Sequence, residues 1–326
     1  MKLRYVLLLI AAFSSLFGLP STLVLSALAQ SGTVTIVVPF TPGTVPDYLS
    51  RLLGDQLKDR IGHPVITDNR AGASGNLGTF RVARAEPDGN TLLMTTASHV
   101  ATNIQPFRRF DFDPATSFEP IILIAKSTLL LVVNSEVPAK SVSEFVALGR
   151  SNASSLNYSS PGPMSLQHLV MEMFKLATGI KATHVPYPGS AGAIRDVVAG
   201  HVNAMFMPID SALPLLLDGK IRALAVASSK RSSLAPNIPT LKEAGVDGFD
   251  VALWFGLLAP AGTPRAVVDR YNALSKDIFT QQRFRDDFER RGLELVAGSP
   301  KQFAEFIQEE TARWSKVIAG AQLKPE

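Results

Sequence analysis

Short apolar runs alternate along the chain with segments in which apolar residues recur every three or four positions. The runs are rich in β-branched residues, which is typical of strands buried on both faces. The segments between them have the spacing of amphipathic helices, so the alternation predicts an α/β fold built on parallel strands, with helices on both faces. The predicted strands are residues 34–38, 64–67, 91–95, 120–124, 129–133, 155–158, 182–185, 204–207, 223–227 and 253–258.

The first strand leads through the loop 39–47 into a predicted helix. Leu49, Leu53 and Leu57 line one face of this helix, Thr44 is placed to cap its start, and Gly62 follows its end. A helix start carries unpaired backbone N–H groups and the positive end of the helix dipole. The loop can therefore hold an anion without a charged side chain, although an ordinary βα turn has the same pattern.

The middle of the chain repeats this strand, loop and helix. Small residues and prolines occupy 159–165 after the strand that ends at Tyr158. The following helix keeps an apolar face from Leu166 to Phe174 and stops near Gly179. Two such loops, one from each half of the chain, predict a shared site for one anion, above all a carboxylate.

Two long uncharged runs, 128–134 and 250–260, lie near one third and three quarters of the chain. We interpret them as crossings between two domains that together form a two-strand hinge. The first lobe then comprises residues 30–130 and 255–326, and the second comprises residues 131–254. This division predicts a ligand cleft between the lobes.

Residues 1–29 have the pattern of a secretory signal peptide. Lys2 and Arg4 supply the positive end, residues 5–28 carry no charge, and small residues precede a cleavage site after Ala29. A retained membrane anchor is the alternative, because the uncharged stretch is long enough to span a bilayer. Its glycine, proline and serines favour cleavage and export.

Composition fits a folded chain of two domains, with 326 residues, of which 46% are hydrophobic and 18% are charged. Loss of Lys2 and Arg4 with the leader lowers the formal net charge from +4 to +2, and the remaining basic residues are scattered. This pattern does not favour nucleic acid as a partner. The chain has no cysteine, which excludes disulfides, thiol catalysis and zinc–thiolate sites.

Motifs for cofactors and metals are not found. Gly72, Gly75 and Gly78 in the loop 69–79 do not have the G-x-G-x-x-G spacing of a dinucleotide site, but this loop adds backbone donors on the first lobe. No cofactor is therefore expected. The histidines have no ligand spacing and are interpreted as isolated, so no metal site is expected; they are His63, His99, His168, His184 and His201.

Ser165 and His168 lie one helical turn apart and could form a nucleophile and base pair in an exported, hydrolase-like enzyme. The alternative interpretation is a helix cap and its neighbour, and no acidic residue can be assigned to orient the histidine. No G-x-S-x-G motif is present. We therefore expect a binding protein and keep the enzyme as an alternative.

Short motifs occur in order over almost the whole mature chain: IVVPF at 36–40, DNRAGA at 68–73, GNLGT at 75–79, PDGNTLL at 87–93, VPAKS at 137–141, LNY at 156–158, HVPY at 184–187, SALP at 211–214, RALAV at 222–226 and WFGLLAPAGTP at 254–264. With these motifs the sequence resembles the substrate-binding proteins of tripartite tricarboxylate transporters, the Bug or TctC family. The resemblance implies two Rossmann-like lobes with a two-strand hinge, as in type II periplasmic binding proteins. It also implies a periplasmic, monomeric receptor that closes on a carboxylate and passes it to membrane transporter subunits. A receptor that signals to a sensor kinase would need the same cleft and is an open alternative.

The resemblance further implies which residues contact the ligand. Contacts of the first loop are Phe40, Thr41, Gly43, Thr44 and Val45, and those of the second are Ser159, Ser160, Gly162, Met164 and Ser165. Additional contacts are implied at Ser74, Gly75, Thr96, Ala97, Ser98, His168, Tyr187 and Met207.

The chain departs from the family pattern at several of these positions. Thr44 replaces the second glycine of a usual pair, and Pro163 and Met164 stand where a glycine and a polar residue are usual. Met207 replaces a frequent polar or acidic residue, and Ser74 and Ser190 replace common glycines. These side chains narrow the predicted pocket and make it less polar, so we expect a mono- or dicarboxylate with an aliphatic or aromatic body rather than citrate.

Overall fold

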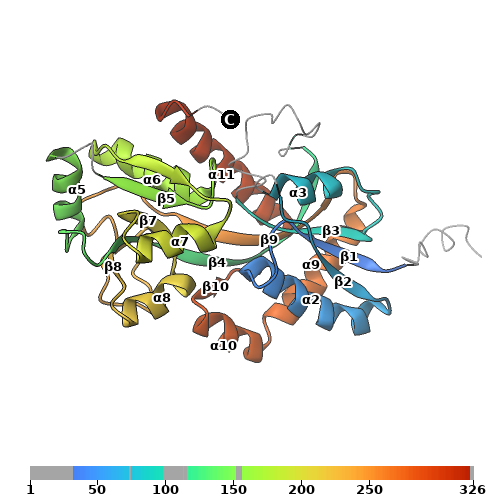
Figure 1. Ribbon diagram of the computed structural model, residues 1–326. Helices are drawn as coiled ribbons and strands as arrows, with labels where there is room; N and C mark the ends of the chain where they lie inside the picture. The colour runs from blue at the N-terminus through green and yellow to red at the C-terminus, as the bar shows by residue number, and fades with distance from the viewer. Residues whose placement is uncertain (1–31, 73–74, 98–112, 114–115, 152–155, 324–326) are drawn as a thin grey trace, which may run out of the picture. The chain divides into compact units, whose positions relative to one another are not determined.

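The computed structural model describes residues 32–72, 75–97, 113, 116–151 and 156–323. Ten strands in these ranges form one sheet with the order β2-β1-β3-β9-β4-β7-β5-β6, and β8 and β10 pair with β4 outside this path (Figure 1). The strands are β1 (Val34–Val38), β2 (Val65–Asn69), β3 (Thr91–Thr96), β4 (Phe118–Asn134), β5 (Asn157–Ser160), β6 (Thr183–Pro186), β7 (Ala204–Pro208), β8 (Ile221–Val226), β9 (Ala252–Pro260) and β10 (Leu293–Leu295).

The helices follow the predicted alternation with the strands, which confirms the α/β class. They are α2 (Val45–Ile61), α3 (Asn76–Ala83), α5 (Val142–Ser151), α6 (Leu166–Thr178), α7 (Ser190–Val198), α8 (Ile209–Leu217), α9 (Arg265–Phe279), α10 (Gln282–Arg290) and α11 (Pro300–Gly320). No helix in the described ranges combines the length and apolar character that a membrane crossing needs. The predicted signal peptide lies outside the described residues.

The longest strand, β4, corrects two of the sequence predictions. It runs without a break through the residues predicted as two strands, because β9 and β10 both pair with it across the polar segment 126–128. The sheet is also mixed rather than parallel. β1 is parallel to β2 and β3, and β5 is parallel to β6 and β7, whereas β4 is antiparallel to β7, β8, β9 and β10.

Strands β4 and β9 connect the two groups of parallel strands (Figure 1). The first part of β4 pairs with β9 from Phe118 to Thr128, and its last part pairs with β7 and β8 from Leu129 to Asn134. These are the two runs that the sequence analysis interpreted as crossings.

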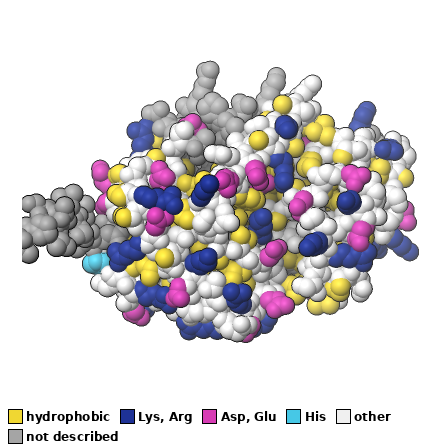
Figure 2. All heavy atoms as spheres, turned by 180° about the vertical axis from the view of Figure 1, so that it is seen from behind, with side chains coloured by type: hydrophobic (Ala, Val, Ile, Leu, Met, Phe, Trp, Pro, Cys, Tyr) yellow, Lys and Arg dark blue, Asp and Glu magenta, His cyan; other side chains and the backbone are white. Residues whose placement is uncertain are grey.

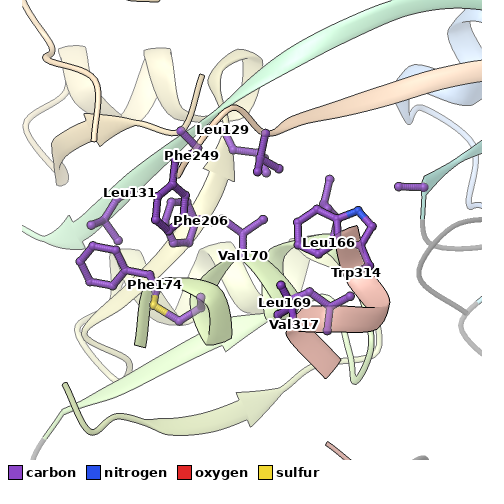
Figure 3. Packing of buried hydrophobic residues seen from close by; sticks show 14 of the residues in the cluster. Leu129, Leu131, Leu166, Leu169, Val170, Phe174, Phe206, Phe249, Trp314 and Val317 are labelled. Atoms are coloured by element: carbon purple, nitrogen blue, oxygen red, sulfur yellow. The ribbon is translucent and has the colours of Figure 1, made fainter. Parts of the chain in front are cut away.

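The C-terminal helix α11 packs against both β4 and α6. Figure 3 shows Trp314 and Val317 of α11 beside Leu166 and Leu169 of α6, within a buried cluster that also contains Phe174. Apolar burial of this kind stabilises the fold by about 25 cal/mol for each Å² removed from water. This packing fixes the start of α6, where the second predicted loop ends.

Charged side chains on the surface are mixed in sign. On the face drawn in Figure 2, Lys and Arg side chains alternate with Asp and Glu side chains. The largest exposed apolar side chains are scattered singly, including Leu217 at the end of α8 and Leu176 in α6.

Candidate ligand-binding site

The first predicted loop connects the end of β1 to the start of α2. Thr44 occupies the N-cap position, as predicted, but its side chain does not cap the helix, because its hydroxyl donates to the carbonyl of Thr41 (2.9 Å). Gly62 ends the helix with a left-handed φ of 74°, a conformation that favours glycine.

Asp47, in the first turn of α2, bonds back to the loop that precedes the helix. Its side-chain oxygen Oδ2 accepts the N–H of Gly43 (2.9 Å), and Nε of Arg51 donates to Oδ1 (3.0 Å). Burial opposes ionisation, but the hydrogen bonds from Arg51 and Gly43 hold the pKa of Asp47 below its usual value. The start of α2 therefore already carries one carboxylate, whose charge Arg51 neutralises.

Asn69 at the end of β2 extends this network to the loop. Arg51 donates to Oδ1 of Asn69 (3.2 Å), and Nδ2 of Asn69 donates to the carbonyl of Phe40 (3.2 Å). The loop is thus held from both α2 and β2. Sequence reasoning missed this network, although an acidic residue in the first helical turn followed by a basic residue four positions later is a recognisable signal.

Backbone donors remain at the start of α2 after these bonds are counted. The structure describes no protein acceptor for the N–H groups of Thr41, Thr44 and Val45. Thr41 and Gly43 are exposed, and Phe40, Thr44 and Val45 are half-buried. This loop can therefore offer N–H groups to an anion from outside.

The second predicted loop differs from the first, because most of its backbone N–H groups already donate to acceptors within the loop or in α6. The N–H of Met164 donates to Nδ1 of His168 (3.1 Å), that of Ser165 to the carbonyl of Gly162 (3.3 Å), and that of Gly162 to Oγ of Ser160 (3.2 Å). Pro161 and Pro163 have no N–H to give. Backbone donors for a ligand must therefore come from the first turn of α6 rather than from these three groups.

Ser165 caps α6 and does not contact an imidazole nitrogen. Its Oγ accepts the backbone N–H of His168 (3.4 Å) and donates to the carbonyl of Gly162 (2.7 Å). Nδ1 of His168 accepts from Met164 instead. The two side chains therefore form a helix cap and its neighbour, not a nucleophile and base pair.

His168 and His184 stack on each other, so the prediction that all the histidines are isolated was wrong. Their ring centroids are 3.9 Å apart with 8° between the planes, and the ring of Tyr158 lies 4.9 Å from that of His184 and 6.2 Å from that of His168. Tyr158 and His184 meet because β5 and β6 pair in register at these residues. Nε2 of His184 lies 2.7 Å from Oγ of Ser160, which ties the stack to the second loop.

Glu172 and Lys175 lie against this aromatic stack. Glu172 is only 6% exposed; it accepts a hydrogen bond from the hydroxyl of Tyr158, and Nζ of Lys175 lies 2.6 Å from its Oε1. Burial, with the nearby charge of Lys175, lowers the pKa of His168 to about 4. Burial, with the proximity of His168, likewise lowers the pKa of His184 to about 4. Both rings are neutral at pH 7, and no cluster of three metal-ligating side chains occurs in the described ranges.

Because His168 and His184 are held neutral in the folded protein, we expect the free energy of unfolding to fall at mildly acidic pH. Both folded-state pKa values, about 4, lie below the ordinary value of 6.5, so between these values the unfolded chain binds more protons. The stack should therefore contribute its full stability above pH 6.5 and lose up to about 3 kcal/mol as the pH falls toward 4, after discounting the partly exposed His184 for solvent screening. Urea unfolding at a series of pH values measures this slope.

The matched variants for this test are His184→Gln and His201→Gln. His201 is exposed, so His201→Gln should keep the wild-type dependence of the unfolding free energy on pH. His184→Gln should flatten it. Equal slopes in wild type and His184→Gln would contradict the assignment.

Other predicted contacts lie at the ends of neighbouring parallel strands. Because β1 and β3 are parallel, the first loop and the buried Thr96 and Ala97 lie at the same edge of the sheet. Gly75, in the left-handed region with φ of 86°, precedes α3. Ser74 and Ser98 lie outside the described residues.

In the second group, β5, β6 and β7 end at one edge and bring together the second loop, Tyr187 and Met207. Tyr187 is half-buried and donates its hydroxyl to Asp196 (2.6 Å). Met207 is fully buried beside Leu130 and Val132, so its side chain lies within the core in this structure.

Comparison with known proteins defines the family. The sequence model of the tripartite tricarboxylate transporter family receptor, TctC, matches residues 49–323. The chain belongs to this receptor family. TctC receptors are periplasmic solute-binding proteins rather than enzymes, so the alternative of an exported hydrolase is wrong.

Individual relatives agree with the TctC assignment. A UPF0065 protein from the tcbD-tcbE intergenic region of Pseudomonas sp. is 33% identical over 88% of this chain and 86% of its own length. Protein BugT of Bordetella pertussis is 31% identical over 89% of this chain and 90% of its own length.

Solved structures show the same fold. The structure of R. palustris Rpa4515 with adipate is 37% identical, covers 91% of this chain and 99% of that one, and superposes with a TM-score of 0.84. MatC from Rhodopseudomonas palustris with bound malate is 32% identical, covers 89% and 99% of the two chains, and has a TM-score of 0.80. These neighbours confirm the predicted fold class of periplasmic binding proteins of the TctC type.

Proposed function

We propose that this TctC receptor binds a small mono- or dicarboxylate with an apolar body and delivers it to the membrane subunits of a tripartite tricarboxylate-type transporter. The ligand lies in a cleft between the lobes 30–130 plus 255–326 and 131–254, with β4 and β9 as the hinge. The mature receptor is a monomer that begins after cleavage at Ala29.

One observation carries the proposal. Each group of parallel strands ends in a short loop that opens a long helix, α2 in one group and α6 in the other. The first turns of both helices hold backbone N–H groups for which the described residues offer no acceptor. Each helix end contributes about 0.3–2 kcal/mol to holding an anion, so two ends and the burial of an apolar body are needed together for micromolar affinity.

The expected ligand class follows from the side chains at these loops. Thr44 adds bulk at the start of α2, and Met164 adds an apolar side chain that is 7% exposed at the second loop. Adipate in Rpa4515 and malate in MatC are both dicarboxylates, and adipate also has an apolar body. We therefore place aliphatic dicarboxylates first and citrate last among the ligands to test.

Thermal shift and calorimetry with the protein beginning at Gln30 test the proposal. Adipate or benzoate should raise Tm, with about 2.7 kcal/mol of added stability at a ligand concentration one hundred times Kd. Adipamide, which lacks the charge, should bind at least tenfold more weakly than adipate. Tight binding of citrate, or no response to any aliphatic or aromatic carboxylate, would overturn the proposal.

A further inference from the structure

The turn that leads into α6 holds a methionine in a left-handed conformation. The N–H of Ser165 donates to the carbonyl of Gly162 (3.3 Å), so residues 162–165 form a β-turn with Pro163 in its second position. Met164, in the third position, has a φ of 60°. A type II turn requires a positive φ at this position and favours glycine there, because a residue with a Cβ atom is strained in it. The conformation of Met164 must therefore be stabilised by contacts with the rest of the chain.

His168, one helical turn into α6, supplies such a contact. Its Nδ1 accepts the N–H of Met164 (3.1 Å). A ring nitrogen can accept only when it carries no proton, so in the neutral ring the proton lies on Nε2. Nε2 lies 3.9 Å from Oε1 of Glu172, a carboxylate oxygen that favours a proton on the nitrogen facing it. The neighbours of both ring nitrogens therefore agree with the same tautomer.

The ring of His168 is itself held in place. It is 6% exposed and stacks on the ring of His184, with the centroids 3.9 Å apart. His184 is tied to the same loop, because its Nε2 lies 2.7 Å from Oγ of Ser160, and this Oγ accepts the N–H of Gly162 (3.2 Å). The two stacked rings thus hold the second loop at Gly162 and again at Met164.

We propose that His168 is a positioning residue that fixes the second loop for ligand binding. Its unprotonated Nδ1 holds Met164 in the left-handed conformation, and the turn 162–165 then sets the direction in which the chain enters α6. The effect on affinity rests on the proposed function, in which the first turn of α6 receives a carboxylate. His168 acts through the backbone of the loop, because its Nδ1 is already occupied.

Calorimetry with adipate, malate and benzoate on matched variants tests this role. His168→Phe keeps a buried aromatic ring but removes the acceptor, so binding of the best of the three probes should weaken about tenfold. His168→Asn, whose Oδ1 takes the place of Nδ1, should bind within about threefold of wild type. His201→Phe, at an exposed histidine, should bind as wild type. Affinity within twofold of wild type in His168→Phe, or equal losses in His168→Phe and His168→Asn, would overturn the proposal.

Met164→Gly separates the route through the backbone from the stacking of the rings. Glycine adopts a positive φ without strain, so the turn should no longer depend on His168. In the Met164→Gly background, His168→Phe should therefore change the affinity by less than about threefold, against about tenfold in the wild type. An undiminished loss in this background would show that His168 does not act through Met164.

Two measurements without ligand separate this proposal from the proposed function. Long-range ¹H–¹⁵N spectra of the wild type at neutral pH should show the His168 ring with its proton on Nε2. Amide hydrogen exchange at Met164 should be faster in His168→Phe than in wild type or His168→Asn. A proton on Nδ1, or equal exchange in the three proteins, would overturn the proposal even if ligands bind. If both results hold and the wild type binds none of the three probes, the proposed function is refuted and the role of His168 in the loop stands.

Discussion

Phe303→Ala is expected to lower the free energy of unfolding by about 3–5 kcal/mol, because it opens a cavity beneath the long strand β9. Phe303 is fully buried, and its ring meets Trp254 edge to face, with centroids 5.6 Å apart. The ring fills the space left by Gly256, where an added Cβ would lie 2.2 Å from Cζ of Phe303. Urea unfolding followed by tryptophan fluorescence measures the loss.

A double-mutant cycle with Gly256 tests the cause of this loss. Gly256→Ala should destabilise the wild type by about 1–3 kcal/mol through overpacking. The same change should have a much smaller effect in the Phe303→Ala background, where the ring is gone. Additive effects of the two substitutions would show that Phe303 does not act through this contact.

The surface pair of Arg265 and Asp269 supplies a control for substitutions of this kind. Both side chains are more than half exposed, and the two charges are 2.9 Å apart. Exposed pairs contribute little, so Asp269→Ala should change the unfolding free energy by less than about 1 kcal/mol.

Elements with a clear hydrophobic period, or with clear capping and turn residues at their ends, could be predicted from the sequence. β1 has the predicted bounds, and α2 ends at Ile61, directly before the predicted Gly62. The three-residue strand β10 was missed, because Leu293–Leu295 is too short to show a hydrophobic period and is defined by its pairing with β4. The continuity of β4 was missed because a polar segment inside a strand resembles a break until its neighbours on both edges are known.

The candidate site shows the same division between local and long-range signals. The two loops were located by the strand, loop and helix pattern, and Ser165 was weighed as a cap because capping depends on residues a few positions apart. The stack of His168 and His184 was missed because it depends on the register of β6 against β5. The hydrogen bond from the Met164 N–H to Nδ1 of His168 was also missed, since it depends on the rotamer of His168.

Glu172→Ala is expected to destabilise the protein by about 3–5 kcal/mol, because it leaves a partly buried charge without its partner. Glu172 bonds to both Tyr158 and Lys175, and the Lys175 side chain is 23% exposed. The substitution therefore removes the acceptor of a buried hydroxyl as well as the counter-charge of an ammonium group. Urea unfolding at pH 7, compared with Asp269→Ala, measures the effect.

Removing both charges tests why Glu172→Ala lowers the stability. Either the ion pair of Glu172 and Lys175 itself stabilises the fold, or the loss comes from leaving the Lys175 charge without a partner. If the loss in Glu172→Ala comes mainly from the unpaired Lys175, then Glu172→Leu combined with Lys175→Met should recover most of the stability. Tyr158 would still lack an acceptor, so recovery should be incomplete by about 1 kcal/mol, and Tyr158→Phe should remove that remainder. A double variant as unstable as Glu172→Ala would instead show that the carboxylate holds the histidine stack and the second loop in place through Tyr158, and carboxylate affinity should then fall with stability.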